Sequence, residues 1–182
     1  MPGRDPDEPL VRRAQRGDPL AFERLVDRHQ HRLFTLAARV TGSRDDAADV
    51  VQEAFVRAWT GLSRFRGQSL FSTWLYRICL NAAHDERERR RPVPADVDGT
   101  VPDSRDRFAD RELSGALQAA LDALEEPFRA VVVLHDVLGC PYAEIAEIVG
   151  VAEGTVKSRL FRGRTELARK LGTHGRATES NR

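Results

Sequence analysis

Over several long stretches of this chain, apolar residues recur at steps of three and four, the spacing that places side chains on one face of an α-helix. Residues 19–40 show it most clearly, with an inward face made of Phe22, Leu25, Val26, Leu33, Ala37 and Val40. The strict alternation that indicates a half-buried strand extends over no useful length. The spacing therefore predicts an all-α protein.

Two further helices are predicted in the first half of the chain, over residues 45–62 and from about residue 70 to residue 90. Gly42 is expected to end the preceding helix and Ser43 to cap the next one, with Asp46 at the spacing of a capping box. The expected inward residues are Ala47, Val50, Val51, Ala54, Ala58 and Leu62, with Phe55 and Trp59 beside them, and then Phe71, Trp74, Leu75, Ile78, Cys79 and Ala82.

The polar faces of these two helices are candidate functional surfaces. Helical spacing leaves Asp49, Gln52 and Glu53 facing outward on the first helix. On the second helix it brings together on one surface Arg77, Asn81, His84 and either Arg87 or Glu88. Each set is either a binding surface or an ordinary solvated face.

The composition changes in the middle of the chain. Residues 91–106 read "RPVPADVDGTVPDSRD", rich in proline and aspartate and without helical or strand spacing, which is typical of a linker. Helical spacing resumes at about residue 108. We therefore expect two small helical bundles, over residues 10–91 and 108–172, joined by a flexible acidic linker over 92–107, with residues 1–9 and 173–182 disordered.

The stretch "YAEIAEIVGVAEGTVKSRLFRGRTELARKL" (residues 142–171) predicts a helix, a tight turn at Gly150 and a second helix. The second helix carries an outward face without acidic residues, formed by Lys157, Ser158, Phe161, Arg162 and Thr165. Gly154 and Thr155 at its start allow the backbone to approach a phosphate closely. A solvated charged face is the ordinary explanation of a run of charges. Here the glycine turn, the small residues and the scarcity of acidic residues on the outward face together favour a helix-turn-helix that enters a major groove.

Charge is divided unevenly along the chain, although the formal net charge is only +1. Residues 10–91 carry 16 Lys and Arg against 10 Asp and Glu, residues 92–128 carry 3 against 9, and residues 153–171 carry 6 against 2. Two basic regions on either side of an acidic connector suit a polyanion that is contacted at two places.

Other classes of protein are disfavoured. No apolar run approaches the ~20 residues that cross a bilayer, and the start "MPGRDPDEPL" lacks the parts of a signal peptide, so we expect a cytoplasmic protein without direct membrane insertion. Cys79 and Cys140 are expected to be reduced thiols, with a redox role as the less favoured alternative, and no metal site or cofactor is expected. No motif of an enzyme active site occurs, and no catalytic residue is assigned.

Three separated motifs resemble, in order, those of the ECF (extracytoplasmic-function) group of bacterial RNA polymerase sigma factors. "DAADVVQEAFVRAW" is similar to the polymerase-binding helix of that family, and "FRGQSLFSTWLYRICLNAAHDERERRR" to its promoter-opening segment. "GCPYAEIAEIVGVAEGTVKSRLFRGR" is similar to its helix-turn-helix. The resemblance covers roughly residues 10–171 and implies an alternative sigma factor, which binds core RNA polymerase, directs it to specific promoters and promotes strand opening.

By this resemblance, the first domain would bind the clamp region of core polymerase and the single-stranded minus-ten element. The polymerase-facing residues would be Asp49, Gln52 and Glu53. The residues facing the minus-ten strand would be Arg66, Gly67, Gln68, Ser69, Arg77, Asn81, His84 and Arg87. Cationic groups suit the phosphates of a single strand, and an amide that both donates and accepts suits an unstacked base.

The second domain, again by resemblance, would bind duplex DNA at the minus-thirty-five element. The residues implied are Lys157, Ser158, Phe161 and Arg162, with Thr155 and Arg159 on phosphates. An anti-sigma factor is the further partner that the family implies. Two residues depart from the family pattern where the helices of the helix-turn-helix begin. Pro141 stands where the family commonly has Ser, and proline is acceptable in a first turn. Ala152 stands where the family commonly has Ser or Pro, and because alanine cannot cap, it costs ~1 kcal/mol relative to Ser.

An autonomous helix-turn-helix repressor or activator is the alternative. It explains the C-terminal segment equally well. It leaves unexplained the motif "DAADVVQEAFVRAW" and the arginine-rich end of the third helix.

Overall fold

The computed structural model describes residues 5–90 and 115–179, with side chains described as far as residue 172. These ranges hold α1 (Glu8–Gln15), α2 (Pro19–Thr41), α3 (Arg44–Gly61), the 3₁₀ turn η1 (Leu62–Arg64) and α4 (Phe71–Arg90), then α5 (Gly115–Asp122), α6 (Glu126–Val132), the π-helical turn η2 (Val133–Val137), α7 (Tyr142–Val149) and α8 (Glu153–Glu179). Neither described range contains a strand, which confirms the all-α prediction. None of the helices described is long and apolar enough to cross a bilayer.

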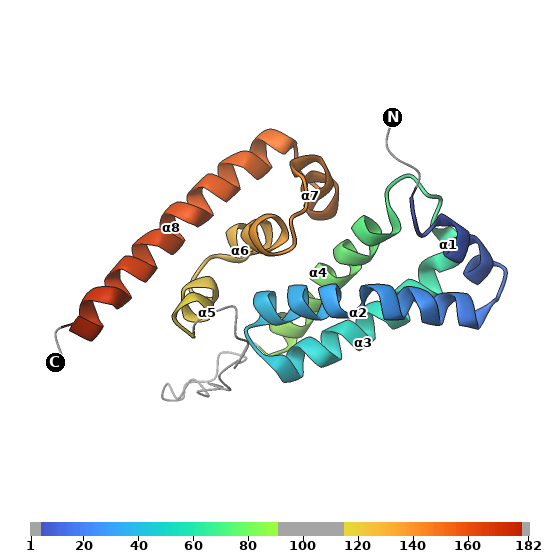
Figure 1. The fold of residues 1–182 in the computed structure, drawn as a ribbon, viewed down its shortest axis with the longest axis horizontal. Helices are drawn as coiled ribbons and strands as arrows, with labels where there is room; N and C mark the ends of the chain where they lie inside the picture. The colour runs from blue at the N-terminus through green and yellow to red at the C-terminus, as the bar shows by residue number, and fades with distance from the viewer. Residues whose placement is uncertain (1–4, 91–114, 180–182) are drawn as a thin grey trace.

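Helices α1 to α4 form the N-terminal unit, in which α2, α3 and α4 pack against one another and α1 packs on α2 and η1 (Figure 1). Its core contains the fully buried side chains of Leu25, Leu33, Leu36, Val50, Phe71 and Leu75. Leu36 lies outside the predicted apolar stripe of α2, but the C-terminal half of α2 also contacts α5 and α6 and is therefore buried on more than one side. Trp59, expected beside the core, is 43% exposed.

The boundary between α2 and α3 follows the sequence prediction, except in one hydrogen bond. Gly42 ends α2 in the left-handed conformation at φ 77°, and the Ser43 hydroxyl accepts a hydrogen bond of 3.3 Å from the Asp46 N–H. The second half of the capping box does not form, because the Ser43 N–H donates to the Thr41 hydroxyl at 3.3 Å. The Asp46 carboxylate instead lies 2.6 Å from the Arg90 guanidinium.

Helices α5 to α8 form the C-terminal unit, in which α8 packs on α5, α6 and α7. The predicted helix-turn-helix is present as α7, a turn at Gly150 with φ 69°, and α8. Its buried side chains include Ile145, Ile148, Val156 and Leu160. Helix α8 continues to Glu179, beyond the predicted end of the domain at residue 172 and into a tail that was expected to be disordered.

We predict that Gly163→Ala destabilises the C-terminal unit, because α8 packs on α6 at this glycine without room for a side chain. A Cβ at position 163 would lie 2.8 Å from Val132 Cγ2 and 3.4 Å from Phe128 Cβ. Overpacking of this kind costs ~1 to 3 kcal/mol, which outweighs the roughly 1 kcal/mol that alanine gains over glycine in a helix. Urea unfolding should show a lower midpoint for this variant.

Gly154→Ala is the matched control, because the same helix has nothing within 4 Å of a Cβ built at that glycine. Its unfolding midpoint should be unchanged or higher. Equal midpoints for the two variants would contradict the close packing of α8 on α6.

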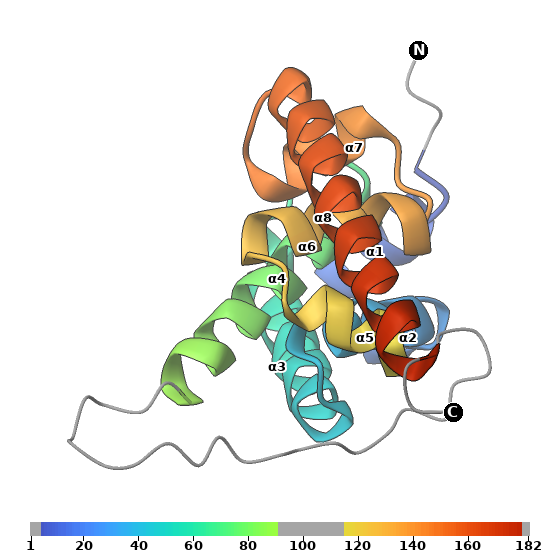
Figure 2. The same ribbon diagram turned by 90° about the vertical axis from the view of Figure 1, so that its left-hand side faces the viewer.

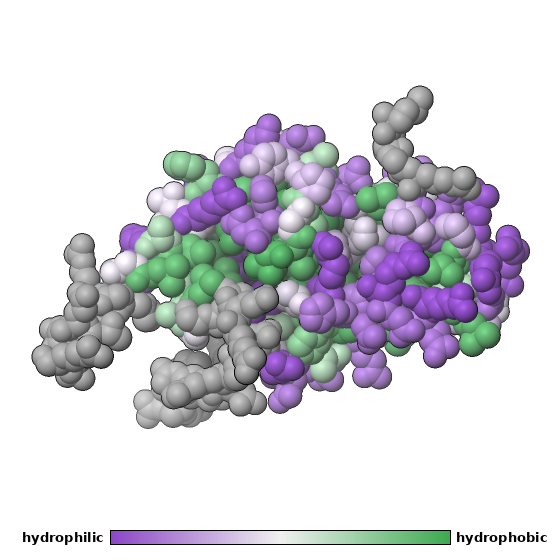
Figure 3. Space-filling model, viewed as in Figure 1, coloured by the Kyte–Doolittle hydropathy of each residue, from purple (hydrophilic) through white to green (hydrophobic). Residues whose placement is uncertain are grey.

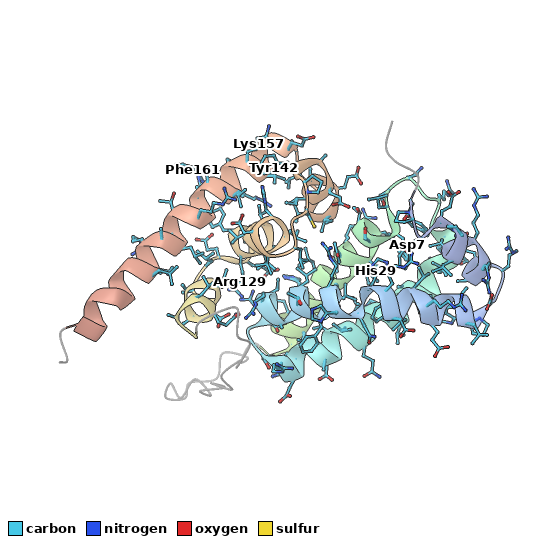
Figure 4. All side chains as sticks on the ribbon, viewed as in Figure 1. Asp7, His29, Arg129, Tyr142, Lys157 and Phe161 are labelled. Atoms are coloured by element: carbon cyan, nitrogen blue, oxygen red, sulfur yellow. The ribbon has the colours of Figure 1, made fainter. Side chains whose placement is uncertain are left out.

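The two units pack directly on each other, through α4 against α7 and through α2 against α5 and η2 (Figures 1 and 2). Arg129 of α6 is 3% exposed and is the most deeply buried cation of this contact (Figure 4). One of its terminal nitrogens donates to the Val40 carbonyl at 2.7 Å, and the other to the Asp122 and Leu124 carbonyls at 2.8 Å. Arg39 of α2 donates to the Gln118 side chain at 2.9 Å. The predicted linker, residues 92–107, lies outside the described residues.

The expectation of disorder at residues 1–9 is wrong for residues 5–9. Asp7 is 2% exposed, and its carboxylate accepts from His29 Nε2 at 2.7 Å and from the Arg28 guanidinium. Figure 4 shows Asp7, at the start of α1, beside His29 in the middle of α2. Because two cationic or hydrogen-bonding side chains surround one carboxylate, this segment is fixed to α2. Residues 1–4 and 180–182 lie outside the described residues.

We predict that this contact makes the protein sensitive to acid. Burial acts to raise the pKa of Asp7, but hydrogen bonds and charges from His29 and Arg28 together hold that pKa below its ordinary value of 3.8. A depressed pKa in the folded state stabilises the protein above about pH 4, and this stabilisation is lost as the pH falls through the folded value. The midpoint of urea unfolding should therefore fall as the pH is lowered from about 5 to about 2.

Asp7→Asn should be less stable than the parent near neutral pH and should lose less stability on acidification. Asp27→Asn, which changes an exposed carboxylate of α2, is the control and should follow the parent. Parallel pH profiles for Asp7→Asn and the parent would rule out this role of Asp7.

Candidate nucleic-acid and polymerase interfaces

The first candidate surface lies on α3, where Asp49, Gln52 and Glu53 occupy one side of the helix. Asp49 and Gln52 are exposed and Glu53 is half-exposed, as helical spacing predicted. All three line a shallow hollow of about 280 Å³ between α3 and α4. The Glu53 carboxylate accepts from Arg57 Nε at 2.7 Å, and the same guanidinium donates to Asp85 at 2.7 Å. These bonds raise the pKa of Arg57 and hold Glu53 in a fixed position.

Two apolar side chains on α3 were not predicted as part of this surface. Val56 lines the same hollow and is 53% exposed, and Trp59 is 43% exposed with its ring 4.9 Å from that of Phe22. Val56 lies seven positions after Asp49 and four after Gln52, so its spacing alone could have placed it on this face. Exposed apolar and aromatic groups beside polar ones are typical of a protein-binding surface.

The second candidate surface begins with the loop Arg66–Ser69, immediately before α4. Arg66, Gly67 and Gln68 are exposed, and Ser69 is half-buried. The chain turns at Gly67, which has φ +67° and therefore favours glycine. The loop lines a hollow of about 850 Å³ whose other walls come from α1 and from α7.

The remaining residues of this surface follow α4 toward its C-terminal end. Arg77 and Asn81 are exposed. His84 Nδ1 lies 3.0 Å from Glu126 Oε1, and Arg87 donates to the other oxygen of Glu126 at 3.4 Å. The predicted minus-ten residues on α4 are thus spread along about half of a helix that is ~30 Å long. The structure brings His84 and Arg87 together at one carboxylate of the C-terminal unit.

The third candidate surface is the outward face of α8. Lys157, Ser158, Phe161 and Arg162 are exposed, with Phe161 at 73%, whereas Thr155 and Arg159 are half-buried. Figure 4 shows Lys157 and Phe161 on the side of α8 that faces away from the N-terminal unit. The Lys157 ammonium lies 5.6 Å from the centre of the Tyr142 ring, close enough for a cation–π contact. The basic, acid-free face predicted from spacing is therefore exposed to solvent.

Not every basic residue of α8 belongs to that face. Arg164 is bound through two nitrogens to the Asp136 carboxylate of η2, one of them at 3.0 Å, and these bonds raise its pKa. Ser158 donates its hydroxyl to the Thr155 carbonyl at 2.9 Å. Arg164 thus fixes α8 against η2, while Arg162 extends from the opposite side of that attachment.

Both helices of the helix-turn-helix begin without a side-chain cap, as expected from Pro141 and Ala152. Pro141 is the N-cap of α7 and makes no side-chain cap bond. At the start of α8, the Thr155 and Val156 N–H groups both donate to the Ala152 carbonyl, at 2.9 and 3.1 Å. The N–H groups of Glu153 and Gly154 precede these two at the start of α8, and the N-terminal end of a helix stabilises an anion such as a DNA phosphate.

The two cysteines are buried thiols in different units. Burial raises the pKa of Cys79 to about 12 and that of Cys140 to about 11, so that neither forms a thiolate near neutral pH. Since thiolate is the reactive form, the structure favours the reduced thiols that were expected over a redox role.

Comparisons with known proteins agree with this arrangement. The family model described as Sigma-70 region 2 matches residues 25–93, and the one described as Sigma-70, region 4 matches residues 114–167. The chain is 37% identical to the ECF RNA polymerase sigma-E factor of Escherichia coli (strain K12) over 180 residues, which cover 91% of this chain and 94% of that protein.

Two solved structures are similar over most of their length. CnrH, in complex with the cytosolic domain of CnrY, has a TM-score of 0.73 at 32% identity and covers 92% of this chain and 97% of its own. The sigma factor RpoE from Bartonella quintana, in complex with the anti-sigma factor NepR, has a TM-score of 0.67 at 25% identity, covering 83% and 96%. Matches in both units, together with the identity over nearly the whole chain, show that this protein belongs to the ECF family of RNA polymerase sigma factors.

Proposed function

We propose that this alternative sigma factor initiates transcription through three separate surfaces, one for core RNA polymerase and two for promoter DNA. The observation that carries this proposal is the distribution of chemistry between the units. The N-terminal unit presents carboxylates, an amide and exposed apolar groups on α3, and cations along α4, whereas the C-terminal unit presents an acid-free basic face on α8. Figure 3 shows that, in this view, hydrophilic residues cover much of the N-terminal unit while hydrophobic residues gather on the C-terminal unit.

The α3 surface is assigned to the clamp region of core polymerase. Asp49, Gln52 and Glu53 provide acceptors and one donor group, and Val56 and Trp59 add apolar area that is available for burial. A surface of this kind combines orientation by polar groups with affinity from apolar and aromatic anchors.

The loop Arg66–Ser69 and the α4 face are assigned to the minus-ten strand. A melted strand needs cations for its phosphates and a recess for a base that has left the stack. Arg77 and Arg87 provide cations for the phosphates, and the hollow beside the loop has room for an unstacked base. Asn81 lies between these cations, and its amide is suited to a base edge.

We predict that Arg77 and Asn81 contribute in different ways. Arg77→Ala should weaken binding to single-stranded minus-ten oligonucleotides of every sequence and reduce the salt-dependence slope by about 0.7. Asn81→Ala should instead change the preference among bases, because an amide reads a base edge and a guanidinium on phosphate does not. Fluorescence anisotropy over a salt series, with oligonucleotides that differ at one base, separates the two effects.

Salt slopes and base preferences that are the same for both variants and the parent would contradict the assignment of the α4 face to DNA. Arg24→Ala, an exposed arginine of α2, is the charge-matched control.

The outward face of α8 is assigned to the duplex minus-thirty-five element. We assign the base contacts in the major groove to the exposed residues Lys157, Ser158, Phe161 and Arg162. The phosphate contacts are assigned to Thr155 and Arg159, which are half-buried. We assign a further phosphate contact to the N-terminal end of α8.

An anti-sigma factor is the regulatory partner proposed for this chain. Support comes from the two similar structures, in which CnrH and RpoE are complexed with the cytosolic domain of CnrY and with the anti-sigma factor NepR. We assign the protein to the cytoplasm, where polymerase acts, and assign bond formation to polymerase alone, so that this chain performs no catalysis itself.

An autonomous repressor or activator is not favoured, because the N-terminal unit as well as the unit with the helix-turn-helix matches a sigma-70 region. Binding of promoter duplex by the purified chain distinguishes the two functions. A sigma factor is expected to bind weakly until core polymerase is added, whereas tight, sequence-specific binding by the chain alone would support the alternative.

A further inference from the structure

We infer that the N-terminal segment Asp5–Gln15 positions the loop Arg66–Ser69 for the minus-ten strand, an inference that rests on the function proposed for that loop. The segment holds the chain on both sides of the loop. Gln15 Nε2 donates to the Leu62 carbonyl at 2.9 Å and to the Phe65 carbonyl at 2.8 Å, just before the loop. Asp5 Oδ2 accepts from the Phe71 N–H at 2.7 Å, just after it.

The bond from Asp5 replaces a missing local helix cap. Helix α4 begins at Phe71, and the residue before it, Leu70, has no side-chain acceptor for the N–H groups of the first turn. The Asp5 carboxylate supplies both the acceptor and a negative charge at the positive end of the helix. The geometry at the junction of loop and helix therefore depends on a residue 66 positions earlier in the chain.

Asp5 is itself held in place. Its other carboxylate oxygen accepts from the Asp7 N–H at 2.9 Å, and its carbonyl accepts from the Glu8 N–H at 3.1 Å. Asp7 in turn is buried against His29, whose ring lies 5.5 Å from that of Phe71. The segment Asp5–Gln15, α2 and the start of α4 are thus joined by contacts that hold both ends of the loop.

The test uses the full chain and single-stranded minus-ten oligonucleotides, with discrimination between bases as the main measurement. Asp5→Ala and Gln15→Ala should each weaken binding about three- to tenfold and reduce base discrimination, because the loop is correctly placed in a smaller fraction of molecules. Asp5→Asn, which keeps a side-chain acceptor, should restore most of the binding and discrimination. Binding of duplex minus-thirty-five DNA should be unchanged in all three.

Asp45→Ala, which removes an exposed carboxylate from the first turn of α3, is the matched control and should bind as the parent does. Parental affinity and discrimination in both Asp5→Ala and Gln15→Ala would overturn the inference. If Asp5→Ala unfolds, Gln15→Ala decides, since it acts on the other end of the loop. Gln68→Ala tests the proposed function of the loop separately. If the loop does not contact the minus-ten strand, Gln68→Ala should bind the oligonucleotide as the parent does.

Discussion

Reversing the charges of Asp49 and Glu53, as Asp49→Lys with Glu53→Lys, should lower the affinity for core RNA polymerase at least about 30-fold, because each lysine would place a cation where the partner now meets an acceptor. Both side chains lie on the rim of the hollow between α3 and α4 and are not part of the core. The change removes the Glu53–Arg57 pair, which at this helical spacing contributes about 0.2–0.5 kcal/mol, and the attraction between Asp49 and Arg90. Association is measured by native gel shift or by anisotropy of labelled protein titrated with core polymerase.

The control is the same reversal of two exposed carboxylates in the other unit, Glu125→Lys with Glu153→Lys, which changes net charge equally. It should associate with core polymerase as the parent does. Unchanged association of the Asp49 and Glu53 variant, with an unchanged unfolding midpoint, would refute the assignment of the α3 surface.

Arg162→Ala should reduce the affinity of the polymerase complex for its preferred promoter by ~1 to 3 kcal/mol, or roughly 5- to 150-fold, if its guanidinium pairs with a guanine edge. The side chain is exposed on the outward face of α8, beside Phe161, so its removal leaves the fold intact. The loss should disappear on a promoter in which the contacted base pair is replaced. Competition binding against a set of single-base promoter variants measures both the loss of affinity on the preferred promoter and its dependence on the contacted base pair.

Arg159→Ala provides the comparison, because that half-buried residue is assigned to phosphate. Its loss should be similar on all promoters and should reduce the salt dependence. A uniform loss for Arg162→Ala would move Arg162 to the phosphate contacts and contradict base reading at this position.

Much of this fold could be predicted from the sequence because its signals are local. Gly42 and Ser43 set a helix boundary through bonds that span at most four residues. The α8 face follows from helical spacing alone, and each of its predicted residues lies on the outward or half-buried side. The same holds for Asp49 and Gln52 on α3.

The contacts that could not be predicted join residues far apart in the chain. Asp5 caps a helix 66 positions away, and Arg129 binds the Val40 carbonyl 89 positions away, through side chains that would read as ordinary surface charges. Trp59 lies at the edge of an apolar stripe, where spacing does not decide between core and surface. Contact between the units depends on pairs such as His84 with Glu126, which no periodic pattern encodes.

Run-off transcription with core RNA polymerase on a promoter library, with and without this protein, tests the central claim most directly. Addition of the protein should direct initiation to a subset of promoters that share sequence at both the minus-ten and minus-thirty-five positions. Transcripts whose amounts and start sites are the same with and without the protein would contradict its assignment as an initiation factor.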